Sequence, residues 1–484
     1  MDEGRPPDPD IAAVDGAAAA SVEFPPEEVP IEPRGPSRAL IAITVVVIAA
    51  LVVFAVLGGR ISAPNAVPTM HSEQRLAVTD GDGRFYTINR DGSGSIEYAI
   101  KGTQFGFPAW SPDGTRIAIT GEGRDGIRLY LWDAATGAAT ASPTTSTAEP
   151  AVLYDELGHP PFYLYWSPDG RQIAFLTSEP DGIALRLVST DAAAGATPAA
   201  RVVREGSPLY WDWLGNDHLV THIGVSGDDA FLGEVDLDGT STESETLSPG
   251  YFRSPAVSSD GAFRAYVTSA RDLTGTVTVE SMRTSQRSEA SVFGVAAVSF
   301  DPTGSTVAYV ASEEQGADDL AFPLGPLKLL DPRTGVNRTL VDGEVVAFYW
   351  APDGETIAVL TFNPADDEVV GAPNARVAST RGSQPDAADE PPPPGAGVPL
   401  TLSFVDVVTG TVRGTRLIDI TSRYVNNILP YFDQYNLSHR TWAPDSSAIA
   451  LPVVVDGRDR LAVIPADGSG MTPLPNAELG FWSP

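Results

Sequence analysis

Histidine is scarce in this chain, which limits the acid–base chemistry that it could perform. The 484 residues contain five histidines and no cysteine. His218 and His222 are four residues apart, but the apolar segment between them is typical of a strand, and no glutamate completes a metalloprotease pair. The sequence Asp80-Gly81-Asp82-Gly83 lacks the further ligands of a calcium loop and is better explained as a hairpin turn. No Gly-x-Ser-x-Gly nucleophile elbow occurs, so we predict no hydrolase of that kind.

One segment combines aromatic and polar side chains in a way that suits ligand binding. It runs from Asn426 to Arg440, directly before Trp442, and a similar aromatic stretch from Tyr154 to Tyr163 precedes Trp166. Rings beside Asp, Gln, His and Arg could hold a peptide, a protein loop or a sugar. The candidate binding residues are Tyr431, Phe432, Asp433, Gln434, Tyr435, His439, Arg440, Tyr154, Asp155 and His159.

Two other roles are open for the same residues. Their rings could fill the centre of the fold while their polar groups satisfy one another. Alternatively, His439 could act as a general base with Asp155, Glu156 or Asp433 as its partner. Clustering of these carboxylates around His439 would favour an enzyme, and their dispersal would favour binding. We predict a non-enzymatic protein with no catalytic residue, metal or cofactor.

A five-residue sequence motif, Trp-Ser-Pro-Asp-Gly or a close variant, repeats along the chain and indicates the elements that position these segments. We call this motif the phrase. Proline and Asp-Gly favour a tight turn, and the flanking aromatic and β-branched residues favour two antiparallel strands. A period of roughly 40 to 55 residues is typical of propellers or solenoids. The phrase begins at Trp110, Trp166, Trp350 and Trp442, with weaker copies at Trp211, Val257 and Phe300 and a shortened copy at Trp482.

The repeats predict an all-β fold, a β-propeller of four-stranded antiparallel blades over residues 75–484. The strand Arg75–Val78 could pair with the C-terminal phrase and close the ring, which removes open strand edges. Eight phrases with this closure predict eight blades, and seven is the alternative because two copies are degenerate. A low-complexity insertion at 363–397 interrupts one blade. The strand order places this insertion on the same face as the segment 426–440.

The phrase followed by Ile-Ala-Ile or Ile-Ala-Phe, as at 117–119 and 173–175, resembles the repeats of TolB-like, WD40-like (PD40) propellers. Such repeats also occur in the propeller domains of prolyl-oligopeptidase-type peptidases. The resemblance covers residues 75–484 and implies the fold, whereas its members include binding, gating and enzymatic proteins. The propeller that gives the family its name is periplasmic and binds protein partners, which is what the resemblance implies here. We expect the chain to depart from the family in its membrane span, in its insertion at 363–397 and in lacking a separate α/β domain before the propeller.

Residues 1–74 contain no copy of the phrase and have a different character. Residues 1–38 are rich in Pro, Ala, Asp and Glu, which predicts a disordered acidic cytoplasmic tail. Residues 39–59 carry no charge and are long enough to cross a bilayer as a transmembrane helix, with 60–74 as a stalk. A cleaved signal peptide is the alternative, but this apolar run is longer and starts later than is usual. Arg34 and Arg38 favour an N-terminus on the inside.

The net charge of −32 opposes binding to nucleic acid, which requires clustered basic residues. Together these features predict a single-pass cell-membrane protein with an extracytoplasmic propeller. Its function would be that of a scaffold for a protein, or for a peptide or glycan ligand, on the propeller face. The alternative is a propeller-type hydrolase or lyase that acts on a carbohydrate or peptide at the central channel.

Overall fold

The structure is a computed structural model that describes most of the chain after residue 73. The described residues are 74–134, 144–145, 149–191, 197–224, 230–242, 247–269, 274–284, 286–313, 323–362, 395 and 397–484. The predicted tail (1–38), the predicted transmembrane helix (39–59) and nearly all of the predicted stalk and insertion lie outside these residues. Within the described ranges, no helix combines the length and the apolar character needed to cross a membrane.

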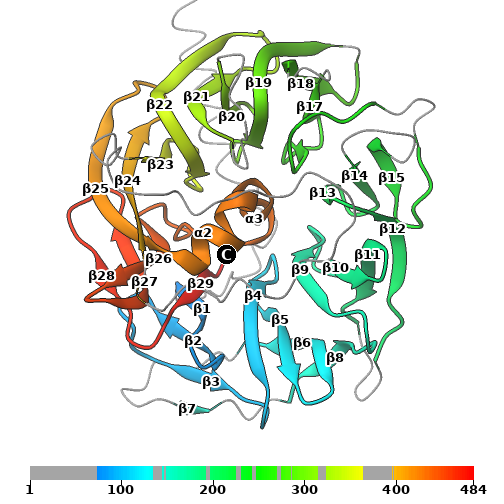
Figure 1. The fold of residues 1–484 in the computed structure, drawn as a ribbon, viewed down its shortest axis with the longest axis vertical. Helices are drawn as coiled ribbons and strands as arrows, with labels where there is room; N and C mark the ends of the chain where they lie inside the picture. Colours follow the sequence, from blue (N-terminus) through cyan, green and yellow to red (C-terminus); the bar gives the residue numbers. More distant parts are fainter. Residues whose placement is uncertain are drawn as a thin grey trace, which may run out of the picture. The chain divides into compact units, whose positions relative to one another are not determined.

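The described part is built almost entirely from antiparallel strands, in an arrangement consistent with the predicted propeller (Figure 1). In the first strand group, β29 (Leu479–Trp482) pairs with β1 (Arg75–Thr79), which also pairs with β2 (Phe85–Asn89). The group continues with β3 (Ile96–Tyr98) and the short parallel β7 (Thr144–Thr145). The predicted pairing of Arg75–Val78 with the C-terminal phrase is therefore confirmed.

Three further groups form separate antiparallel sheets. The strands of each group follow one another in sequence, as expected for hairpins joined by tight turns. Their strands are β4 (Gln104–Trp110), β5 (Arg116–Gly123), β6 (Gly126–Asp133) and β8 (Ala151–Tyr154); β9 (Pro161–Trp166), β10 (Gln172–Glu179), β11 (Gly182–Ser189) and β12 (Arg201–Gly206); and β13 (Leu209–Leu214), β14 (His218–Ile223) and β15 (Phe231–Asp236).

The remaining strands form one continuous ladder of 13 strands, because long strands pass from one group to the next. In β19, residues 287–293 pair with β18 and residues 297–300 pair with β20, and β22 divides in the same way. A single residue pair, Ile420 with Val453, joins β25 to β26. The ladder contains β16 (Ala256–Val257), β17 (Phe263–Ser269), β18 (Thr274–Ser281), β19 (Arg287–Phe300), β20 (Val307–Ser312), β21 (Gly325–Leu330), β22 (Asn337–Trp350), β23 (Thr356–Phe362), β24 (Gly397–Asp406), β25 (Val412–Thr421), β26 (Ala448–Val455), β27 (Arg458–Pro465) and β28 (Thr472–Pro473).

Strand pairing shows that the phrase occupies one equivalent place in every group. Trp110 lies opposite Ile117, and the same separation of seven residues recurs, with one exception, at the other copies that are followed directly by a second strand. In the exception, Trp213 lies opposite Leu219, so the phrase starts at Trp213 and its predicted start at Trp211 is wrong. The ladder splits into four groups, which with the four groups above gives eight in the described residues. The eight repeated positions are Trp110, Trp166, Trp213, Val257, Phe300, Trp350, Trp442 and Trp482.

The residue types of the phrase are explained by hydrogen bonds within its turn. Ser111 Oγ donates to Asp113 Oδ1 at 2.6 Å and accepts from the Arg116 backbone N–H at 2.9 Å. Gly114 has a φ of 69°, a left-handed conformation that favours glycine. Side chain and backbone together therefore lock the turn, which is why serine, aspartate and glycine recur at this spacing.

Indole groups of the phrase link neighbouring strand groups. Trp166 Nε1 donates to the Ala109 carbonyl at 3.0 Å, and Trp442 Nε1 donates to the Tyr349 carbonyl at 3.0 Å. In each case the acceptor is the residue directly before the repeated position of another group. These tryptophans are therefore structural, because each buried indole N–H finds a partner only when two groups are docked.

A helical segment, residues 422–439, lies inside the ring of strands (Figure 1). It consists of α2 (Ser422–Asn427), the 3-10 helix η2 (Leu429–Tyr431) and α3 (Phe432–Ser438). α3 contacts the strands β9, β13, β19 and β22, which belong to different groups. Phe432 is fully buried and packs against the rings of Phe348 and Tyr349. We call residues 422–439 the central helical segment.

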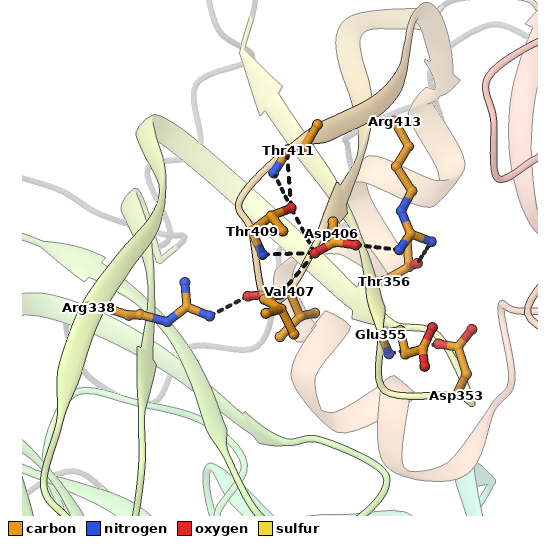
Figure 2. A network of polar contacts seen from close by, with 10 residues as sticks. Arg338, Asp353, Glu355, Thr356, Asp406, Val407, Thr409, Thr411 and Arg413 are labelled. Carbon is orange, nitrogen blue, oxygen red and sulfur yellow. Dashed lines mark hydrogen bonds and ion pairs between the residues drawn. The ribbon is translucent and has the colours of Figure 1, made fainter. Parts of the chain in front are cut away.

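A polar network ties the turn between β24 and β25 to its surroundings (Figure 2). Asp406 accepts hydrogen bonds from the Thr409 backbone at 2.8 Å and from Arg413, whose other nitrogen donates to Thr356 Oγ1 at 2.9 Å. Hydrogen bonds from the Thr409 backbone and from Arg413 hold the pKa of Asp406 well below its usual range. Arg338 of β22 donates to the Val407 carbonyl. Since these groups satisfy one another, we interpret the network as structural.

Candidate functional site

The strand order gives the ring two distinct faces. Each phrase forms the turn after the first strand of its group, and antiparallel pairing places all of these turns at one end of the strands. We call this end the turn face. The connections between groups start at the opposite end, the connection face, and include residues 154–161 and the start of the central helical segment.

The central helical segment buries most of the binding residues predicted in it. Phe432, Asp433, Gln434 and His439 are buried, and Tyr435 is half-buried. The Tyr435 ring contacts Tyr163 edge to face, with ring centroids 5.4 Å apart. Six of the predicted binding residues lie in this segment and a seventh, Arg440, directly follows it. Of these seven, only Tyr431 and Arg440 are exposed. The buried residues therefore match the alternative predicted from the sequence, in which the rings fill the centre of the fold.

Several polar groups of this segment are satisfied inside the ring. Asp433 Oδ2 accepts from the Ser254 backbone N–H at 3.3 Å, and Oδ1 accepts from the Gln434 N–H at 3.0 Å. Burial raises the pKa of Asp433 to about 6, because the loss of water outweighs the opposing effects of the Arg253 charge and of backbone hydrogen bonds. The Tyr163 hydroxyl donates to the Gln434 carbonyl at 2.6 Å. These contacts hold α3 to two different strand groups.

His439 is surrounded by aromatic rings, and no carboxylate contacts it among the described residues. Its Nδ1 lies 2.6 Å from Ser438 Oγ, and the Phe481 ring lies 4.5 Å from its own between centroids. Its Nε2 has no hydrogen-bond partner in the described ranges. Burial lowers the pKa of His439 to about 3, so the imidazole is neutral.

The second predicted segment, around Tyr154, forms a charge network of its own. Arg186 contacts both Glu156 and Glu179 at 3.1 Å, and its guanidinium lies 5.7 Å from the Tyr154 ring centroid. His159 Nδ1 lies 2.5 Å from Glu179 Oε2. Tyr154 is buried, His159 is half-buried and Asp155 is exposed. The structure brings Tyr154 and His159 together in this network and leaves Asp155 at the surface.

The turn face contains a cavity that the sequence reasoning missed. Its volume is about 820 Å³, and all eight repeated positions contribute to its wall. Residues 436–441, at the end of the central helical segment and just beyond it, also line it, among them His439 and Arg440. The repetition of the phrase was the available signal, because equivalent positions in a closed ring face one common axis.

A buried carboxylate that was not predicted also lines this cavity. Asp212 Oδ1 accepts from the Tyr165 hydroxyl at 2.8 Å and from the Trp213 N–H at 2.8 Å, and Oδ2 accepts from the Val257 N–H at 2.7 Å. Burial raises the pKa of Asp212 to about 6. With three donors directed at it, Asp212 holds the two neighbouring groups in register with its own.

Comparison with known proteins finds solved structures of low similarity. No protein-family model matches the chain, and no curated protein matches it. A crystal structure of a eukaryotic initiation factor has a TM-score of 0.47 and 11% identity, covering 85% of this chain and 90% of that one. TolB from Acinetobacter baumannii has a TM-score of 0.36 and 14% identity, with 79% and 67% covered. An oligogalacturonate lyase in complex with manganese has a TM-score of 0.37 and 12% identity, with 80% and 95% covered. At such identities and scores these likenesses carry no argument about function.

Proposed function

We propose that this chain is a membrane-anchored, TolB-like propeller of eight blades that acts as a non-enzymatic scaffold and binds a protein partner on its connection face. The observation behind the proposal is that none of the three carboxylates considered as partners of His439 contacts it. Asp433 is bonded to backbone groups, Glu156 is paired with Arg186, and Asp155 lies at the surface. A general base needs a partner that orients it and a pKa near the working pH. His439 has no carboxylate partner among the described residues, and burial lowers its pKa to about 3.

One observation favours the enzymatic alternative, a hydrolase or lyase at the central channel. Ser438 Oγ lies 2.6 Å from His439 Nδ1, and both residues line the cavity. However, a neutral imidazole whose pKa is lowered to about 3 is a weak base for activating a serine hydroxyl. The pair is better explained as a local hydrogen bond that fixes the end of α3.

Exposed apolar side chains on the connection face support binding there. Leu157 is 74% exposed, and Phe162 and Tyr431 are each 38% exposed. Arg253 lies over the Tyr431 ring, 5.2 Å from its centroid, and the Tyr210 ring centroid is 6.5 Å away. Tyrosine and arginine are enriched among the residues that dominate binding energy at protein interfaces.

The test is capture of partners from native membranes by the full chain. A Leu157→Ser, Tyr431→Ala double variant is compared with a Val336→Ser, Val408→Ser control, whose side chains are 59% and 82% exposed in turns at the opposite end of the strands. We expect one partner that the control retains and the double variant loses. Equal capture by both variants, or no partner with the unchanged chain, would contradict the proposal.

The proposed membrane topology has a separate test. The uncharged run at 39–59 supports an anchor, and the arginines before it support an N-terminus on the inside. Protease added to intact cells should then degrade the propeller and spare a tag at the N-terminus. Protection of the propeller would contradict the proposed orientation.

A further inference from the structure

The cavity on the turn face is separate from the surface proposed above for a protein partner. Its lining includes the eight repeated positions, six of which are tryptophan. Trp110 and Trp350 are half-buried and offer ring surface to the cavity, whereas the other four tryptophans are buried. A volume of about 820 Å³ falls within the range that encloses a small-molecule ligand. Ligand sites of this kind are mostly apolar and carry a few polar groups that fix orientation.

Arg440 is the basic residue among those that line the described cavity, and its surroundings are unusual. Arg440 is exposed and lines the cavity, yet enough protein surrounds its guanidinium that desolvation lowers its pKa. Two arginines with largely buried side chains are paired with carboxylates: Arg186 contacts Glu156 and Glu179, and Arg264 contacts Glu280 at 2.9 Å. No carboxylate lies within ion-pair distance of the Arg440 guanidinium among the described residues. In a chain with twice as many acidic as basic residues, 63 against 31, such a guanidinium stands out.

The carboxylates that line the same cavity are already engaged. Asp260 Oδ1 accepts from Ser258 Oγ at 2.7 Å and from the Ala262 N–H at 3.0 Å. Asp301 Oδ1 accepts from the Ser305 N–H at 2.6 Å. Asp212 is directed at backbone groups and a tyrosine, as described above. These acids serve their own turns, so the charge of Arg440 is left for a ligand.

We propose that this cavity binds a small monocarboxylate with a ring body, its carboxylate paired with Arg440 and its ring packed against the half-buried indoles of Trp110 and Trp350. A guanidinium offers two parallel donors that match a carboxylate. Indole faces suit planar or ring-shaped groups. The acidic residues at the cavity oppose ligands with two negative charges, which favours a single carboxylate over a phosphate monoester. The carboxylate could be carried by an aromatic ring or by a sugar ring, and the experiment distinguishes these sources.

The experiment is calorimetric titration of the full chain, purified in mild detergent, with matched pairs of probes. N-acetyl-tryptophan is compared with N-acetyl-tryptophanamide, and glucuronate with glucose, so that each pair differs in the carboxylate. The variant is Arg440→Gln, and the control is Lys101→Gln, which removes a charge from an exposed loop outside the cavity lining. Circular dichroism and thermal melting check that both variants fold, and Arg440→Lys tests whether charge alone suffices.

We expect at least one carboxylate probe to bind at least about tenfold more tightly than its neutral partner, as charge-assisted hydrogen bonds do. Arg440→Gln should abolish this difference, Arg440→Lys should retain part of it, and Lys101→Gln should leave it unchanged. Binding by the aromatic pair or by the sugar pair identifies the ring. Equal binding of carboxylate and neutral probes, a difference that survives in a folded Arg440→Gln variant, or no saturable binding of either carboxylate at millimolar concentration would overturn the proposal. None of these outcomes depends on partner binding at the connection face.

Discussion

Replacement of Trp482 by alanine should test whether β29 closes the ring of strands. The side chain is fully buried and packs in a cluster with residues of β1, β2, β26 and β27, so it joins the first strand group to the last. Removing a buried tryptophan side chain costs about 3 to 5 kcal/mol, from lost apolar burial and the cavity that remains. For the roughly 340 described residues, an unfolding entropy near 2 cal/mol/K per residue converts that loss into a melting temperature lower by about 4 to 7 °C.

The assay is thermal unfolding followed by circular dichroism, with Trp482→Phe as a graded variant and Leu417→Ala as the control. Leu417 is an apolar side chain that is 59% exposed, so its removal should shift the melting temperature by less than about 1 °C. Trp482→Phe should fall between the unchanged chain and Trp482→Ala, because a smaller ring leaves a smaller cavity. If Trp482→Ala melts within 1 °C of the unchanged chain, or no lower than Leu417→Ala, the reasoning that β29 closes a packed ring is wrong.

Two further predictions concern titration. Burial raises the pKa of Asp433 to about 6, against about 3.9 in an unfolded chain. Its contribution to stability is therefore full near pH 3, and the free energy of unfolding should fall by about 3 kcal/mol in total as the pH rises to about 7, with about 2 kcal/mol of this loss between pH 4 and 6. Denaturant unfolding at several pH values gives the free energy of unfolding as a function of pH. This free energy should fall less steeply with pH in Asp433→Asn than in the unchanged chain, and an identical pH dependence would count against the buried charge. Arg413→Gln should raise the pKa of Asp406 toward its ordinary value while moving the melting temperature by no more than about 1 °C, since the pair is exposed (Figure 2). A shift of several degrees would show that the network is worth more than an exposed pair.

The sequence determined the local structure of the strands and turns. Proline, aspartate and glycine at fixed spacing define a turn by short-range hydrogen bonds, as between Ser111 and Asp113, so eight copies could be found without coordinates. The pairing of Arg75–Val78 with the last copy could also be predicted, because one strand lacks a turn before it and the other lacks a turn after it. The degenerate copy was misplaced by two residues, since Trp211 and Trp213 fit the pattern equally well and only pairing with Leu219 separates them.

Only the tertiary structure decided the burial of the candidate binding residues and the position of the cavity. Aromatic and polar residues in the segment 426–440 are compatible with a surface loop or with a packed centre, and the choice depends on contacts with residues more than a hundred positions away, such as Tyr163 and Ser254. Likewise, Arg440 stands among polar residues in the sequence, and its lack of a carboxylate partner is a property of where the ring places it. Hydrogen bonds within a turn depend on neighbouring residues, so the sequence predicts them. Burial and charge pairing depend on which distant strands the closed ring brings together.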